Sequence, residues 1–531
     1  MSMLSNVKLS EILYYVFFLL LFTTRILGLY EGNVVYSSIL VISLICFIIS
    51  YLMTPTTVVA YCFDFILLFL ALISWRLSGE KGLLLFFSMM IGVRRISIDR
   101  LFKIVLTISG TAYSIMIMLG ALGFINEYQN LLSYRVIVGY INRRTISPLQ
   151  INIVMEPYLV LMVLALYLIR NKGKKITLIV SGSLFLGVLY LFGYCFAYSS
   201  LLISILILTS NYYLKFYNSF SKITDIFSHL IYLFFIIISI VGSYLEDSVY
   251  GSGGTLQRRF QIGHYYLQYY SPTLFGQRII NPDPKYMAYD IHQSQLHLYL
   301  YYGIVLFVVV NLLHHIAIQC FVKWRDATAL STTLSFSALG VVEPLLFNLS
   351  FKNIVFVFVG KAYGEMLDRI STKHRILGRN IQVIPDKEFI IKKSIPIYLA
   401  NKFDFLLKNP IRVKKSIVFA MIVGCVAAGV AAVKIPEKAY MFDQSERSSV
   451  DGIEYYFSPS EIHDLDEQGI PLFGDRENGG IFYKRVNYAP VYDYIRLIVS
   501  SFIWTTIWLF IFLVLLSKSD KDCYHIGNNN T

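Results

Sequence analysis

Long apolar runs separated by short polar segments make up most of the chain. A bilayer-spanning helix needs about 20 apolar residues, and runs near that length recur along the whole sequence. The pattern predicts an all-α polytopic membrane protein of about 14 transmembrane helices. The predicted spans are centred near Phe18, Leu44, Leu67, Phe87, Ile115, Val160, Leu184, Ile205, Ile237, Val308, Phe336, Val357, Val426 and Leu509. Residues 176–213 form two of these spans only if a tight turn occurs around residues 193–199.

Basic segments between the spans predict which side of the membrane each loop occupies. The segments VRRISIDRLFK, IRNKGKK, LKFYNSFSK and VKWRD follow the fourth, sixth, eighth and tenth predicted spans. Because Lys and Arg concentrate in cytoplasmic loops, we expect these segments and both termini in the cytoplasm. The same alternation places residues 123–150, 246–295 and 434–492 on the outer face of the cytoplasmic membrane.

The amino-acid composition agrees with a membrane protein and gives no reason to expect a nucleic-acid partner. Of 531 residues, 56% are apolar and only 15% are charged, whereas soluble domains carry about a quarter charged residues. A net charge of +13 would suggest nucleic acid for a soluble chain, but cytoplasmic basic loops account for it here and no nucleic-acid partner is expected. Apart from Cys523, the cysteines lie in or at the ends of apolar runs, so we expect neither a disulfide framework nor a metal site.

The pattern divides the chain into four parts. These are a membrane domain (1–365), a basic cytoplasmic linker (366–415), a two-span module (416–516) with a short outer segment (434–492), and a cytoplasmic tail (517–531). In the two-span module, Gly424, Ala428 and Ala432 recur every fourth residue, and such a stripe of small residues lets helices approach closely. We expect this span to pack against the last span or against another copy of the chain.

The polar segment from Gly251 to Gln295 is the strongest active-site candidate. A long loop at a membrane surface is uncommon unless it folds over something or carries chemistry. This loop holds Arg258, Arg259 and Arg278, although arginines are disfavoured on the outer face. Guanidinium groups suit phosphate because they present paired donors and keep their charge. We therefore expect a site for an anionic headgroup.

A second outer loop, residues 123–150, adds Arg143 and Arg144 to this expectation. Any single arginine could instead extend to the phosphates of the surrounding lipid. The occurrence of two adjacent pairs, Arg143 with Arg144 and Arg258 with Arg259, favours a shared anion site over that alternative.

Several motifs in and beside the segment Gly251–Gln295, called the central loop below, occur in an order known from one family. Arg259 precedes L-F-G-Q at residues 274–277, H-Q-S-Q-L at residues 292–296 and Y-G-I at residues 302–304. In this respect the chain resembles the Wzy-type polysaccharide polymerases and the related O-antigen ligases. His292 falls where the family carries the first residue of its box, and Gln293 stands where Asn is usual.

Two further segments resemble the same family in part. Residues 343–353 resemble its late E-x-x-x-x-N segment, which begins here at Glu343. Residues 143–152 resemble an outer-loop box that begins with arginine, but the usual Gly and Phe are missing. By topology the resemblance extends over about residues 1–365, and its motifs are confined to these few segments. L-F-G-Q together with Arg259 is closer to the polymerases than to the ligases.

The resemblance implies glycosyl transfer on the outer face of the membrane, without a metal or a cofactor. A growing glycan leaves undecaprenyl diphosphate and joins a second lipid-linked oligosaccharide repeat. Arg259 is then expected to stabilise the diphosphate, His292 to accept the proton of the acceptor hydroxyl, and Glu343 to orient a sugar or a catalytic side chain. The residues expected to bind substrate are Arg258, Arg143, Arg144, Arg278, Asp290 and Gln293. Membrane lipids, a flippase and a chain-length regulator are the other expected partners.

Several alternatives stay open at this level. Asp290 could act in place of His292, which could instead cap a helix. The protein could be an O-antigen ligase, which shares the histidine box, or a non-catalytic assembly subunit. A flippase or transporter for lipid-linked oligosaccharide would need ionisable residues inside the membrane, and the best candidate is Asp64.

Overall fold

A computed structural model describes most of the chain. The described residues are 6–29, 33–125, 130–135, 139–149, 153–218, 220–246, 255–282, 290–344, 346–347, 352–373, 378–390, 410–433, 448–450, 453–455 and 490–516. They form two compact units, each of which is described by itself. The first unit comprises Met1–Tyr113, Ile153–Phe192 and Ala197–Lys392, and the second comprises Ser114–Asn152, Gly193–Phe196 and Lys393–Thr531.

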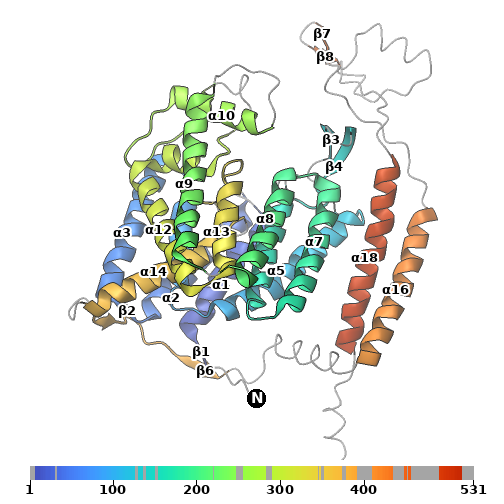
Figure 1. The fold of residues 1–531 in the computed structure, drawn as a ribbon, viewed down its shortest axis with the longest axis horizontal. Helices are drawn as coiled ribbons and strands as arrows, with labels where there is room; N and C mark the ends of the chain where they lie inside the picture. The colour runs from blue at the N-terminus through green and yellow to red at the C-terminus, as the bar shows by residue number, and fades with distance from the viewer. Residues whose placement is uncertain are drawn as a thin grey trace, which may run out of the picture. The chain divides into compact units, whose positions relative to one another are not determined.

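Helices account for most of the described residues (Figure 1). The helices are α1 (Leu9–Ile26), α2 (Val34–Met53), α3 (Val58–Ser78), α4 (Gly82–Val93), α5 (Ile98–Ala121), α6 (Met155–Leu168), α7 (Lys174–Cys195), α8 (Tyr198–Phe216), α9 (Lys222–Leu245), α10 (Thr255–Tyr269), α11 (Ser294–His297), the π-helix η1 (Leu298–Tyr302), α12 (Gly303–Trp324), α13 (Ala327–Leu339), α14 (Val355–Lys373), α16 (Pro410–Val433) and α18 (Pro490–Leu516). Among the described residues, the strands are short and form four two-stranded pairings.

Within the described residues, nine helical segments are long and apolar enough to cross a membrane. The structure therefore agrees with an all-α membrane protein. Every predicted span centre lies in a helix, and the expected turn is present because α7 ends at Cys195 and α8 begins at Tyr198. Some of these helices are short, since α4 has 12 residues, α13 has 13 and α6 has 14, against the roughly 20 that span a bilayer. The full count of spans stays a prediction.

Three segments that the sequence assigns to the cytoplasmic side meet at one end of the first unit. Strand β1 (Asn6–Lys8) pairs antiparallel with β6 (Glu388–Ile390), and β2 (Thr56–Thr57) pairs antiparallel with β5 (Asn380–Ile381). The N-terminus, the α2–α3 connection and the segment after α14 thus share one end of the bundle. This agrees with the alternation of spans, while the membrane side itself stays a prediction.

The first basic segment lies at this end and is held by ion pairs. Arg100 lies 2.6 Å from Glu11, and the buried side chain of Arg94 lies 3.1 Å from Asp64. Tyr51 and Tyr363 also donate hydrogen bonds to Asp64, each at 2.9 Å. The carboxylate named above as the transporter candidate is therefore engaged in a structural network that joins α2, α3 and α14.

In the second unit, α16 packs along α18. A Cβ atom on Gly424 would lie 2.2 Å from Thr506 Oγ1 and 3.0 Å from the Phe502 carbonyl oxygen, so only glycine fits this approach. The predicted packing of the small-residue stripe against the last span is confirmed at Gly424. Helix α18 also holds the α7–α8 turn, because Arg496 Nη2 donates to the Gly193 carbonyl at 2.7 Å.

The second unit also contains two hairpins. Strand β3 (Asn130–Arg135) pairs antiparallel with β4 (Gly139–Arg144), and β7 (Ser448–Val450) pairs with β8 (Ile453–Tyr455). The first hairpin belongs to the predicted outer loop 123–150, and it carries Arg143 and Arg144 at the end of β4. Apart from the β7–β8 hairpin and residues 490–492 at the start of α18, the predicted outer segment 434–492 lies outside the described residues.

Candidate functional site

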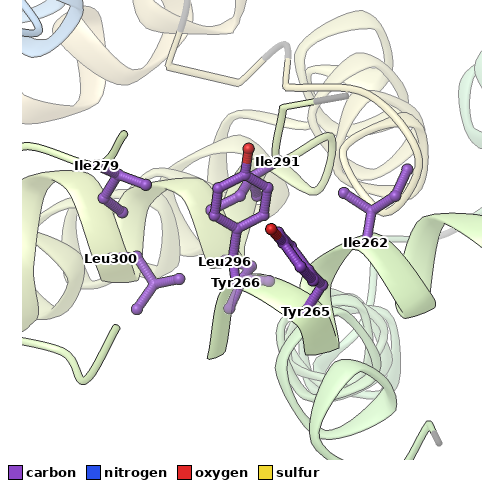
Figure 2. Close-up of a cluster of buried hydrophobic side chains, with 7 residues drawn as sticks. All are labelled: Ile262, Tyr265, Tyr266, Ile279, Ile291, Leu296 and Leu300. Atoms are coloured by element: carbon purple, nitrogen blue, oxygen red, sulfur yellow. The ribbon is translucent and has the colours of Figure 1, made fainter. Parts of the chain in front are cut away.

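An apolar cluster packs helix α10, which carries Arg258 and Arg259, against the residues that follow it in the chain (Figure 2). The polar and apolar positions of α10 alternate with helical period, so that one face is buried and the other is exposed. The cluster is formed by Ile262, Tyr265, Tyr266, Ile279, Ile291, Leu296 and Leu300. These side chains come from α10, from the residues that follow α10, and from α11 and η1. Their burial therefore brings three consecutive segments of the chain together.

Two glycines let α10 lie directly against the end of α9, as Figure 1 shows. A Cβ on Gly242 of α9 would lie 2.8 Å from the ring of Phe260. A Cβ on Gly263 of α10 would lie 2.4 Å from Ser243 Oγ. His264 Nδ1 lies 3.0 Å from the Ser243 carbonyl oxygen, so this histidine binds the C-terminal end of α9. These contacts fix the position of α10 relative to the bundle.

The segments that contain the L-F-G-Q and Y-G-I motifs are joined by backbone hydrogen bonds at a break in a helix. At Gly303, where φ is +86°, the π-helix η1 ends and α12 begins. The break frees backbone groups on both sides, and the loop satisfies them: Ile304 N–H donates to the Thr273 carbonyl at 2.9 Å, and Gln277 N–H donates to the Tyr301 carbonyl at 3.2 Å. The two motifs therefore build the scaffold of the central loop.

Gln293 and Ser294 tie the histidine box to its neighbours. Gln293 is fully buried, and its Nε2 donates to the Arg259 carbonyl at 2.6 Å and to Ser243 Oγ at 3.1 Å. Ser294 N–H donates to the Gly340 carbonyl at 2.7 Å, and its Oγ donates to the Glu343 carbonyl at 2.6 Å. The box thus connects α10 to the segment that follows α13. Gln293, expected to bind substrate, holds the backbone of Arg259.

Arg259 and Glu343 form an ion pair at the centre of this arrangement. Arg259 Nη2 lies 3.2 Å from Glu343 Oε1, although 84 positions separate the two residues in the chain. Their side chains are only 15% and 13% exposed, which removes much of the screening that water would provide. The structure therefore brings together two of the three residues that the sequence assigned to catalysis.

A second ion pair, absent from the sequence-based expectations, lies next to the first. Lys352, just before α14, places its Nζ 3.6 Å from Glu156 Oε2 in the first turn of α6. The two residues are 8% and 1% exposed. One sequence signal could have found Glu156: it precedes Pro157 at the edge of an apolar run, as Glu343 precedes Pro344. A lone lysine in a short loop, such as Lys352, offered no comparable signal.

This setting changes the proton affinities of His292 and Glu343 in opposite directions. Burial, followed by the positive charges of Arg259 and Lys352, lowers the pKa of His292 to about 3. Burial raises the pKa of Glu343 above its ordinary value, and Arg259 and Lys352 oppose that rise. His292 is therefore a neutral imidazole at neutral pH, and it adjoins both cations.

The remaining predicted residues of the central loop occupy more exposed positions. Arg258 and Arg278 are exposed, on α10 and on the loop after it. Asp290 is also exposed, and after burial it is the main cause of the raised pKa of Tyr266, so its carboxylate faces that tyrosine. These three residues are exposed, whereas the paired side chains of Arg259 and Glu343 are only 15% and 13% exposed.

Arg143 and Arg144 belong to the second unit, whereas Arg259, His292 and Glu343 belong to the first. Arg143 is 7% exposed, and its Nε donates to the Cys195 carbonyl at 2.6 Å. Because Cys195 is the last residue of α7, this contact satisfies a terminal carbonyl that has no partner within the helix. Arg144 follows at the end of β4, and a substrate-binding role for either residue stays a prediction.

The ionic site has the composition needed to hold a charged substrate. It combines two cations, Arg259 and Lys352, two carboxylates, Glu343 and Glu156, and the neutral ring of His292. The residues come from α10, α6 and the loops before α11, after α13 and before α14, all of which the predicted alternation of spans assigns to the same membrane side. Comparison of the chain with protein-family models, with curated proteins and with solved structures found no match.

Proposed function

We propose that this protein is a glycosyltransferase that polymerises undecaprenyl-diphosphate-linked oligosaccharide repeats on the outer face of the cytoplasmic membrane. The observation that carries the proposal is the buried Arg259–Glu343 pair beside His292 and Lys352. Buried charges are costly to maintain and are concentrated at sites that use them. The product would be an O-antigen, a capsule or an exopolysaccharide.

The cations act on the leaving group. Transfer of the growing glycan breaks the bond between its first sugar and the lipid diphosphate, and negative charge develops on the departing phosphate oxygen. Arg259 stabilises that charge with paired guanidinium donors, and Lys352 adds a second positive charge to the site. A diphosphate is already a good leaving group, so charge stabilisation by side chains serves this step.

Glu343 is a better proton acceptor in this mechanism than His292. An efficient general base has a pKa near the working pH, and a pKa of about 3 makes His292 a weak base. The pKa of Glu343 is raised toward that range by burial. When the diphosphate binds Arg259, it competes with Glu343 for the guanidinium group, so arrival of the donor frees the carboxylate to accept the proton of the acceptor hydroxyl.

His292 then has a different task in the same site. A neutral imidazole both donates and accepts hydrogen bonds, which suits the hydroxyl groups of a sugar. Its low pKa keeps it neutral beside the cations, so it does not repel them. The role of His292 in the proposal is therefore to position the acceptor sugar, while Arg259 and Glu343 perform the chemistry.

The proposal is tested by replacing the chromosomal copy with Arg259→Ala and following the glycan in cells. We expect single-repeat lipid-linked oligosaccharide to accumulate and long polymer to disappear. Arg76→Ala is the matched control, because Arg76 is an exposed arginine at the end of α3, which the alternation of spans places on the same side. Normal polymer lengths in the Arg259→Ala strain, with the protein present at the wild-type level, would contradict the proposal.

A second measurement separates polymerase from the alternatives. Purified protein is incubated with lipid-linked single repeats, and the products are resolved by length. Multimeric lipid-linked products support polymerisation. Transfer only to a lipid A-type acceptor would identify a ligase. Movement of the unchanged substrate across the membrane would identify a flippase.

A further inference from the structure

We propose that a cavity at the basic end of the first unit binds a phosphate-bearing anion. The cavity has a volume of about 460 Å³ and lies between the start of α9, the end of α12 and α14. Four cations line it: Lys222, Lys323, Arg325 and Arg369. Two of the basic segments that the sequence explained by membrane orientation alone, LKFYNSFSK and VKWRD, therefore meet around one space.

The acidic groups nearby leave an excess of positive charge. Lys323 lies 3.2 Å from Glu365, and Arg369 pairs with the same carboxylate. Asp225, which also lines the cavity, lies 3.4 Å from His229 Nε2. The side chains of Lys222 and Arg325 have no ion pair or hydrogen bond within the described part of the chain, and both are exposed to an incoming ligand.

The backbone of α9 adds positive potential at the same place. The helix begins at Lys222, directly after Ser221, which lines the cavity and whose side chain makes no capping hydrogen bond. The first amide groups of a helix have no acceptor within the helix, and the positive end of its dipole lies there. This arrangement strengthens anion binding in a cavity that already carries four cationic side chains.

The conformation of Arg325 is an independent sign that its side chain is used. Arg325 ends α12 with φ +55° and ψ +37°, a left-handed conformation. Glycine adopts this conformation without strain at helix ends, whereas an arginine does not. Strained positions of this kind are concentrated at functional sites. Arg325 is therefore held in a left-handed conformation at a turn that lines the cavity.

The size of the cavity indicates the class of ligand. At about 30 Å³ per molecule, 460 Å³ corresponds to roughly 15 waters, which exceeds what inorganic phosphate fills. The cavity therefore leaves room for a further group attached to the phosphate. Two sources share that chemistry: the headgroup of an anionic phospholipid, and a soluble phosphorylated compound such as a nucleotide.

The test compares the purified full-length protein with two double variants of equal charge. Lys222→Ala/Arg325→Ala removes the two cations whose side chains form no ion pair or hydrogen bond with the described residues. Lys172→Ala/Lys175→Ala removes two exposed lysines of another basic segment that do not line the cavity. In the lipid arm, binding of phosphatidylglycerol and of phosphatidylcholine is counted by native mass spectrometry. In the soluble arm, pyrophosphate and ATP are titrated against the thermal unfolding midpoint.

We expect one arm to give binding that the Lys222/Arg325 variant weakens at least tenfold and the Lys172/Lys175 variant leaves unchanged. The responding arm identifies the source of the phosphate. Equal effects of the two double variants, or no binding of any probe in either arm, overturn the proposal.

Discussion

Gly276 and Gly303 lie against each other with positive φ angles of +93° and +86°. A Cβ on Gly303 would lie 2.3 Å from the Gly276 nitrogen, and a Cβ on Gly276 would lie 2.2 Å from the Tyr301 carbonyl oxygen. Both sites therefore exclude any other residue, for conformational and for steric reasons. This contact joins the loop after α10 to the helix break, and it explains physically why both motifs contain glycine.

Replacing either glycine should destabilise the central loop. We predict that Gly303→Ala costs more than the roughly 1–2 kcal/mol of a left-handed alanine, because Gly303 has φ +86° and ψ +169°, a conformation that essentially only glycine adopts, and because its Cβ meets backbone atoms that cannot rotate away. Gly79→Ala is the control: Gly79 is left-handed, with φ +82°, and nothing lies within 4 Å of its Cβ position. Thermal unfolding of both variants in detergent checks the difference, and equal midpoints would contradict the prediction.

The Arg259–Glu343 pair should show strong coupling in a double-mutant cycle. Arg259→Gln leaves a buried carboxylate without its counter-charge, and we predict a loss of about 3–5 kcal/mol in stability. Arg259→Gln/Glu343→Gln should recover most of that stability because no unpaired charge remains. Polymerisation should stay at least about a hundredfold below wild type in both, since the cation that stabilises the leaving group is missing. Recovery of activity in the double variant would remove Arg259 from the chemistry.

The pH dependence of activity should follow Glu343 and not His292. The pKa of Glu343 is raised above 4.5, and a proton acceptor must be ionised, so activity should increase as the pH rises through that raised value. His292, with a pKa of about 3, contributes no step between pH 5 and 8. Initial rates measured across this range check the assignment. His292→Gln should lower the rate and keep the shape of the profile, and a profile that loses its acid limb in His292→Gln would return the base role to His292.

The same shift of His292 predicts an acid dependence of stability. The folded protein holds the pKa of this residue at about 3, below the ordinary 6.5, so the unfolded chain binds the proton more readily. The contribution of neutral His292 to the stability of the folded protein is therefore complete above pH 6.5, and it is lost as the pH falls toward 3. Between pH 7 and pH 4, the thermal midpoint of the wild type should fall more steeply than that of His292→Gln, which lacks the titrating group. Parallel curves would mean that His292 is not shielded from protonation.

The C-terminal helix pair offers two glycines with opposite expectations. Gly424→Ala should destabilise the α16–α18 contact, because its Cβ would lie 2.2 Å from Thr506 Oγ1. Gly429→Ala should stabilise α16 by about 1 kcal/mol, because nothing lies within 4 Å of its Cβ position and alanine is the better helix former. Resistance of the purified protein to heat and to protease measures both. If Gly429→Ala instead destabilises the protein, this face of α16 also packs against a neighbouring helix.

The amino-acid sequence by itself determined the helices, the membrane class and the region that carries the candidate site. These features depend on runs of neighbouring residues, because the length of an apolar run and the charge of the next loop decide locally whether a segment enters a bilayer. Arg259, Glu343 and His292 were also recognisable, since arginines on an outer loop and a histidine at a helix entry stand out by residue type.

Only the tertiary structure decided how these residues act on one another. The pairing of Arg259 with Glu343 across 84 positions, and the presence of Lys352 and Glu156 beside them, depend on four helices packing together. The pKa of His292 depends on burial and on two cations from separate segments, and no local pattern contains that information. For the same reason, two loops read as markers of membrane orientation were found to surround a common cavity.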